Sequence, residues 1–164
     1  MAFDAFLKIT GGPNGESTDS KHTNEIELLG FEMSASNPSS IGSSTTGTGT
    51  GKVQMGAFKA TKRVDSASPV LFQSCCSGDH YTGATVTIRK AGGKNPLEYL
   101  IYTFTEVYVD TIFTHGNAKL DDTVLETVTF SFSSIHEKYV PQKTDGTGGS
   151  PIEGGWDVTT NQPK

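Results

Sequence analysis

Alternation of apolar and polar residues is the dominant pattern along this chain. It is clearest in residues 126–135 (ETVTFSFSSI) and 84–91 (ATVTIRKA), where apolar side chains recur at every second position. A period of two is typical of β-strands that have one face in a core and the other in water. The core face would carry Val128, Phe130 and Phe132 in one strand and Val86 and Ile88 in the other. Thr85, Thr87 and Arg89 are then expected to face water.

Three further segments predict strands, and two of them depart from simple alternation. Residues 2–9 (AFDAFLKI) predict one strand, and in residues 25–33 (EIELLGFEM) the apolar phase shifts beside Gly30, which predicts a β-bulge or a corner. Residues 97–113 (LEYLIYTFTEVYVDTIF) are apolar on both faces. Such a strand lies either between two layers of one chain or against another subunit, and the pattern favours neither.

One segment has a helical period instead. In residues 65–80 (DSASPVLFQSCCSGDH), Ser68 and Pro69 form a good N-cap and first-turn pair, and Gly78 is a typical C-terminal stop. The spacing predicts a helix of two to three turns that packs one apolar stripe on the sheet. That stripe would consist of Leu71, Phe72, Cys75 and Cys76.

These elements predict a mainly β fold, an antiparallel β-barrel with one flanking α-helix and a long extended loop. Closure into a barrel would remove exposed sheet edges. The length of 164 residues indicates a single domain spanning residues 1–164. No internal repeat is visible.

Charge and the N-terminus limit the classes of function. A net charge of −5 at pH 7 argues against nucleic-acid binding, which needs clustered Lys and Arg. No apolar run is long enough to cross a membrane. The start, MAFDAFLKIT, lacks the basic flank and apolar centre of a cleavable signal peptide. We therefore expect a cytoplasmic protein, unless an export route that reads no N-terminal signal carries it out.

The loop of residues 34–51 contains SSTTGTGTGK (43–52), which invites comparison with a phosphate-binding loop. A P-loop needs a Gly where this chain has Thr46, and Ser or Thr where it has Val53. Fourteen of the eighteen residues from 34 to 51 are Ser, Thr or Gly, too polar to offset their own ordering entropy. The loop is either a mobile surface segment or one that orders against a neighbouring subunit. The candidate contact residues are Ser43, Ser44, Thr45, Thr46, Gly47, Thr48, Gly49 and Thr50.

Candidate catalytic and metal-ligating groups form no recognisable site. The four histidines are scattered without metal-ligand spacing, so each is expected at the surface or partly buried: His22, His80, His115 and His136. Asp121 and Asp122 fit a solvated turn better than a cation site. Adjacent Cys75 and Cys76 are expected to be reduced. We therefore predict no catalytic residue, no metal, no cofactor and no enzymatic activity.

Several short strings, in this order and spacing, resemble the Hcp (haemolysin-coregulated protein) family, the tube subunit of bacterial type VI secretion. They are GEST (15–18), DSKH (19–22), VDSASPVLFQSC (64–75), TIRKAGG (87–93), EYL (98–100), YVPQKTDGT (139–147) and GGWDV (154–158). The resemblance implies a homohexameric ring that stacks into a hollow tube, which a contractile sheath drives out of the cell. It implies sheath, spike and effector proteins as partners, and secretion without a cleavable signal. A ring-shaped carrier that holds effectors in its lumen is the alternative.

The resemblance also implies roles for two parts of this chain. The loop of residues 34–51 would reach a neighbouring subunit or ring. In the second strand, relatives often have a Trp-Ser-Trp-like run, whereas this chain has Phe31, Glu32 and Met33. If the register is shared, Glu32 places a ring of carboxylates in the lumen. Such a ring would disfavour acidic cargo.

Overall fold

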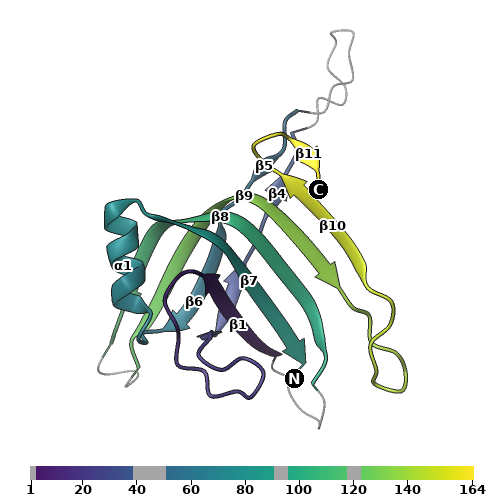
Figure 1. The fold of residues 1–164 in the computed structure, drawn as a ribbon, viewed down its shortest axis with the longest axis horizontal. Helices are drawn as coiled ribbons and strands as arrows, with labels where there is room; N and C mark the ends of the chain where they lie inside the picture. Colours follow the sequence, from purple (N-terminus) through teal and green to yellow (C-terminus); the bar gives the residue numbers. More distant parts are fainter. Residues whose placement is uncertain (1–2, 39–50, 91–95, 118–122) are drawn as a thin grey trace.

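The structure is a computed structural model that describes residues 3–38, 51–90, 96–117 and 123–164. It is mainly antiparallel β with one α-helix in the described residues, which confirms the predicted fold class (Figure 1). The elements, in chain order, are β1 (Phe3–Thr10), β2 (Ile26–Leu28), β3 (Gly30–Glu32), β4 (Ala35–Ser36), β5 (Gln54–Met55), β6 (Phe58–Arg63), α1 (Ser68–Ser77), β7 (His80–Lys90), β8 (Glu98–His115), β9 (Leu125–Tyr139), β10 (Ile152–Asp157) and β11 (Gln162–Pro163).

The strand pairings run round in a cycle. From β1 they pass through β7, β8, β9 and β6 to β3, and β2 pairs with β1. Leu29 joins β2 to β3, and its N–H donates to the Thr61 carbonyl at 2.7 Å. The corner predicted beside Gly30 is therefore present, since the chain leaves β1 there and joins β6. This cycle is consistent with the predicted barrel.

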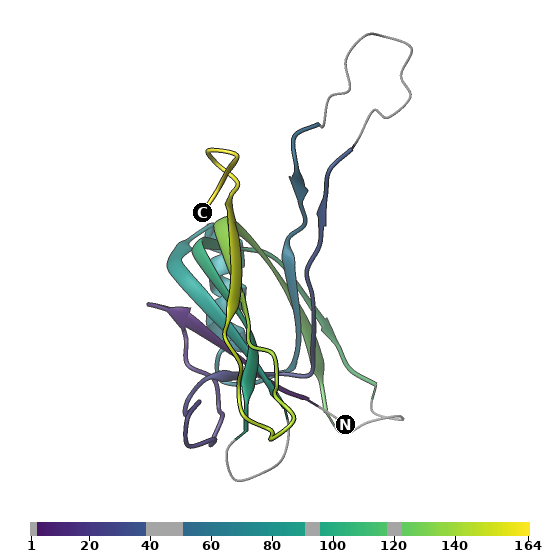
Figure 2. The ribbon, with the colours of Figure 1, turned by 90° about the vertical axis from the view of Figure 1, so that its right-hand side faces the viewer.

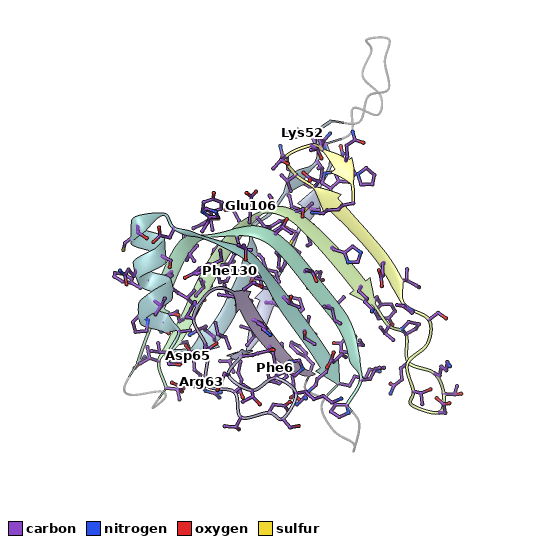
Figure 3. All side chains as sticks on the ribbon, in the orientation of Figure 1. Phe6, Lys52, Arg63, Asp65, Glu106 and Phe130 are labelled. Carbon is purple, nitrogen blue, oxygen red and sulfur yellow. The ribbon has the colours of Figure 1, made fainter. Side chains whose placement is uncertain are left out.

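The two longest strands bend together. On β8, Tyr102 and Phe104 are buried before the bend, whereas Val107 and Val109 are buried after it. Glu106 lies between them with φ of 47°, a conformation that moves the core-facing set by one residue. Figure 3 labels Glu106 at the crest of the sheet. Because of this bend, β9 pairs with β10 along one half and with β6 along the other.

The core is a cluster of aromatic and β-branched side chains inside the cycle of strands. Phe58 lies 5.8 Å from Phe31 and 5.1 Å from Phe104 between ring centroids. The predicted core residues of β7 and β9 are buried, apart from Phe132, which is half-buried: Val86, Ile88, Val128 and Phe130. On the opposite face of β8, Tyr99 and Ile101 are half-buried, so this face of the strand is only partly covered within one chain.

The expectation that Thr87 and Arg89 face water is wrong. Both are buried, with exposed fractions of 7% and 8%. The segment of residues 11–25, between β1 and β2, lies against this face, and Asp19 from it pairs with Arg89. Glycine is required at position 15 of this segment because a Cβ there would lie 2.4 Å from the Glu25 carbonyl oxygen. Alternation alone cannot reveal a loop that folds back on the outer face of a strand.

The helix α1 has the predicted place and length, but its start and its buried face differ. Ala67, not Ser68, is the N-cap, whereas Gly78 ends the helix as predicted with φ of 74°. The buried side chains are Ser68, Leu71 and Ser74. Phe72 and Cys76, predicted for the apolar stripe, are exposed. The small Ser74 fits against the sheet through a 2.6 Å hydrogen bond with the Tyr81 hydroxyl.

Candidate interaction surfaces

A two-stranded arm projects from the body of the molecule. Its stem consists of residues 33–38 and 51–56, in which β4 and β5 pair only with each other (Figure 2). Most side chains of β4 and β5 are exposed. The stem shows that the predicted loop of residues 34–51 begins as a hairpin. The candidate contact residues Ser43, Ser44, Thr45, Thr46, Gly47, Thr48, Gly49 and Thr50 lie outside the described residues.

An apolar groove separates the base of the arm from β9 and β10. It has a volume of about 320 Å³, and its apolar lining includes Met33, Met55, Tyr102, Ile135 and Trp156. Trp156 belongs to the GGWDV string. The preceding Gly155 is required because a Cβ there would lie 2.8 Å from the Lys164 carbonyl oxygen and 2.9 Å from the Ile135 carbonyl oxygen.

A second cleft, of about 450 Å³, lies between the arm stem and the turn that joins β10 to β11. Lys52 and Val53 line it from the stem, and Trp156 and Asn161 from the turn. Figure 3 labels Lys52 at this end of the molecule. The arm stem and the turn between β10 and β11 are therefore neighbours in space, although they are far apart in the sequence (Figure 1).

Glu32 has a partner that the sequence did not reveal. Lys59 on β6 lies directly opposite Glu32 on β3, and its Nζ donates to Glu32 Oε2 at 2.8 Å. Both side chains are open to solvent, at 73% for Glu32 and 43% for Lys59. In a ring of subunits, each Glu32 carboxylate would therefore have a Lys59 ammonium beside it, so the predicted ring would not consist of carboxylates alone. The lumen placement of Glu32 remains a prediction.

Exposed large apolar side chains gather in two separate regions. The α1 flank, defined as the region around the helix and the neighbouring part of β8, carries Val64, Val70, Phe72, Tyr108 and Val124. The β10 flank, defined as the region around the β9–β10 connection, carries the register partners Tyr139 and Ile152, whereas Phe3 and Leu29 are exposed at the start of β1 and beside β3. Figure 1 shows α1 on one side of the molecule and β10 on the other. Such patches mark protein–protein contacts.

A buried lysine ties α1 to the sheet. Lys62 Nζ donates to Asp65 Oδ1 at 2.7 Å, to Ser68 Oγ at 2.9 Å and to the Arg63 carbonyl at 2.9 Å. An ammonium has three protons, so all are used. Glu126 Oε1 lies 3.3 Å from Lys62 Nζ. It therefore interacts with the ammonium charge electrostatically, without a hydrogen bond. Figure 3 labels Asp65 at the foot of α1.

A second charged cluster lies outside the barrel, between the segment of residues 11–25 and the strands beneath it. Arg89 Nε donates to Asp4 Oδ2 at 3.0 Å, and its Nη2 donates to Asp19. The guanidinium also lies 4.9 Å from the centre of the Phe6 ring, and His22 stacks on Phe6 at 4.2 Å. The hydrogen bond from Arg89 holds the pKa of Asp19 at about 2, and Asp19 in turn raises the pKa of Arg89.

The histidines and cysteines form no site in the described residues. His22 is 6% exposed, so the expectation of a surface or partly buried side chain is wrong for it. Its Nδ1 lies 2.9 Å from Glu25 Oε2. Cys75 and Cys76 are both free, as expected. Among residues whose positions the structure describes, no group of His, Cys, Asp or Glu is arranged to hold a metal, and no helix suits a membrane span.

Comparison with known proteins shows which family this chain and its fold resemble. A family model described as "Type VI secretion system effector, Hcp" matches residues 6–139. Protein hcp1 of Pseudomonas aeruginosa is 41% identical over 162 residues, or 98% of each chain. The solved structure of a type six secretion system protein is 35% identical with a TM-score of 0.93, over 99% of this chain and 100% of that one. Hcp1 from Salmonella typhimurium is 37% identical with a TM-score of 0.82, over 100% of both chains.

The family model spans the strings from GEST to EYL, and the alignment to the Pseudomonas protein extends over 98% of this chain. Identity above 30% over nearly the full length, together with the family model, establishes the relationship. The chain belongs to the Hcp family of the type VI secretion system.

Proposed function

We propose that this protein is the tube subunit of a type VI secretion system. It forms hexameric rings that stack into a hollow tube for effector delivery, with sheath, spike and effector proteins as partners. The observation that carries the proposal is the presence of two different apolar flanks on opposite sides of one Hcp-family subunit. A monomer would leave both flanks in water.

Ring formation follows from the difference between the flanks. An isologous dimer would bury the same patch on both copies, whereas two unlike patches favour head-to-tail contacts that close into a ring. In this arrangement the α1 flank of one copy, with Phe72 exposed at 61%, meets the β10 flank of the next, with Ile152 exposed at 66%.

The arm supplies a further contact in this proposal. Its stem pairs only with itself and projects beyond the barrel, so it is free to reach another subunit or ring. Residues Ser43 to Thr50 continue from this stem, and we propose them as the contacting segment. Their hydroxyls and backbone groups would hydrogen-bond to the neighbouring copy.

A role as effector carrier is the second candidate function. It requires the ring but not end-to-end stacking. The solvent-open row that holds Glu32 and Lys59 favours it, because hydrated polar side chains suit transient contact with a passing or resting protein.

Negative-stain electron microscopy and light scattering of the purified protein test the ring. We expect discrete rings for the wild-type chain and monomers for each of two variants, Phe72→Glu and Ile152→Glu. Each variant keeps one intact flank, so an equimolar mixture is expected to form heterodimers that cannot close. A wild-type chain that remains monomeric at high concentration would refute the ring. Homodimers of one variant alone would refute the head-to-tail arrangement.

A further inference from the structure

One row of side chains crosses four strands on the outer face of the barrel. Direct register partners run from Glu32 on β3 to Lys59 on β6, Thr129 on β9 and Thr111 on β8. Directly paired residues of antiparallel strands point to the same side of the sheet. The row therefore presents one acid, one base and two hydroxyls to solvent.

Asp110 adds a carboxylate beside this row, because its Oδ1 accepts a 2.8 Å hydrogen bond from Ser131 Oγ, two residues along β9 from Thr129. The next row joins Gly30, Thr61, Thr127 and Phe113, and contains no ionisable group. Lys62 and Glu126 lie on the opposite side of their strands and are buried together. Arg63, at the end of β6, lines a cleft that also contains Glu16, Glu27 and Asp65. Glu32 and Lys59 are therefore the two charges of the row itself, and they form an ion pair.

The pair is an electrostatic feature more than a structural one. Its atoms are 2.8 Å apart, yet both side chains are largely solvated, and exposed ion pairs contribute little to folding stability. What the pair does change is the potential at the surface. A carboxylate repeated around a ring would repel acidic molecules, whereas a lysine within hydrogen-bonding distance cancels each charge locally.

We infer that Lys59 makes this protein tolerant of the charge of the polypeptide it carries. This inference rests on the proposed ring, in which the Glu32 face lines the lumen. The carried partner is a polypeptide that contacts hydroxyls and neutralised ion pairs, so neither acidic nor basic chains are excluded. Lys59 is then the residue that prevents Glu32 from selecting against acidic cargo.

Binding of two matched synthetic peptides tests the inference. The peptides are equal in length and differ only in carrying glutamates or lysines at the same positions, and fluorescence anisotropy at low ionic strength gives each dissociation constant. For wild-type rings we expect the two constants to agree within about twofold. In Lys59→Ser the acidic peptide should bind about fivefold more weakly than the basic one, as one exposed charge contact would give.

The companion variants make the result specific. Glu32→Ser should reverse the preference, and the double variant Glu32→Ser/Lys59→Ser should restore the wild-type ratio. Moderate salt should erase every difference, since exposed charges are screened. An unshifted ratio in Lys59→Ser, a wild-type ratio beyond about tenfold, or failure of intact rings to bind either peptide would each overturn the inference.

Electron microscopy of each variant separates this inference from the proposed function. If rings are absent in the wild-type chain, the ring proposal fails and the inference fails with it. If rings are present in all variants and the peptide ratio does not move, only the inference fails.

Discussion

Lys59 and Lys62 lie three residues apart on one strand and have opposite surroundings. The Lys62 side chain is 1% exposed and is held by Asp65 and Ser68, whereas the Lys59 side chain is 43% exposed and has Glu32 beside it. The odd spacing turns the two lysines to opposite faces of β6. One lysine of β6 is therefore buried inside the fold, and the other lies on its surface.

The comparison shows how burial decides what a charge does. Desolvation makes a buried ammonium costly, so Lys62 is compatible with the fold only while its three acceptors and the Glu126 carboxylate remain in place. Lys59 keeps most of its hydration and needs no partner for stability. Lys62 is therefore a structural residue of the α1 anchor, and Lys59 is available for recognition.

Replacing Lys62 should have the largest effect on stability. We expect Lys62→Met to lower the free energy of unfolding by about 3–5 kcal/mol, because Glu126 and Asp65 would be left without a buried counter-charge. Urea unfolding followed by circular dichroism, at matched protein concentration, measures the loss.

The double variant Lys62→Met/Glu126→Leu is the matched control. Replacing a buried ion pair by apolar side chains is often nearly neutral, so much of the lost stability should return. Equal stability of Lys62→Met and wild type would show that the buried lysine does not anchor the helix, and the contrast with Lys59 would collapse.

Replacing Arg89 should cost less stability than replacing Lys62 and more than replacing Lys59, and the loss should depend on pH. Arg89→Met is expected to cost about 2 kcal/mol at neutral pH, since it removes charged hydrogen bonds to Asp4 and Asp19. The pKa of Asp19 is lowered from 3.8 to about 2, so its pairing stabilises the fold above pH 3.8 and is lost as the pH falls through 2. The difference between wild type and variant should therefore narrow from pH 4 to pH 2.

Denaturant titrations across that pH range give the measurement, with Lys8→Met as an exposed control on β1. A gap that stays constant down to pH 2 would mean that the Asp19 pair does not contribute to stability in this way. A difference in unfolding free energy that narrows toward pH 2 would show that the Arg89 cluster stabilises the fold less than the buried Lys62 cluster and more than the exposed Lys59 pair.

The strands at residues 84–91 and 126–135 were predictable because one face of each lies in a single continuous core, whereas β10 and β11 were not predicted. Val128 and Phe130 repeat with the period of the sheet, and the shift beside Gly30 marks the corner where the chain changes partners. The helix was predictable in place, since Pro69 and Gly78 bound it. Its buried face was not, because Ser74 and Leu71 fill a site whose size depends on the strands beneath.

The charged clusters were missed because their partners are distant in sequence. Arg89 meets Asp4 and Asp19 only after β1 and β7 pair and the following segment folds over them. One signal was present: Lys62 and Glu126 both stand at core-facing positions of alternating strands, after Ala60 and before Val128. A charge in a core phase on two strands predicts a buried pair.

The Glu32 face shows the opposite limit of sequence reasoning. The resemblance predicts that Glu32 faces the lumen, which stays a prediction, and in the structure the Glu32 side chain is 73% exposed on β3. The lysine opposite became visible only with the register of β3 on β6, since 27 residues and the whole arm separate the two. Strand register, which local patterns specify poorly, decides the charge of this surface.

Replacing Lys59 should have the smallest effect on stability. We expect Lys59→Met to change the free energy of unfolding by less than about 0.5 kcal/mol, because its ion pair with Glu32 is exposed and largely solvated. The same urea titration used for Lys62→Met gives the value, so two identical substitutions on one strand are compared directly. A loss of more than about 2 kcal/mol would mean that the Glu32–Lys59 pair holds β3 to β6, and that its charges are not free for recognition. A small loss, beside a large one for Lys62, would show that β6 carries on one face a charge that the fold requires and on the other a charge that it does not.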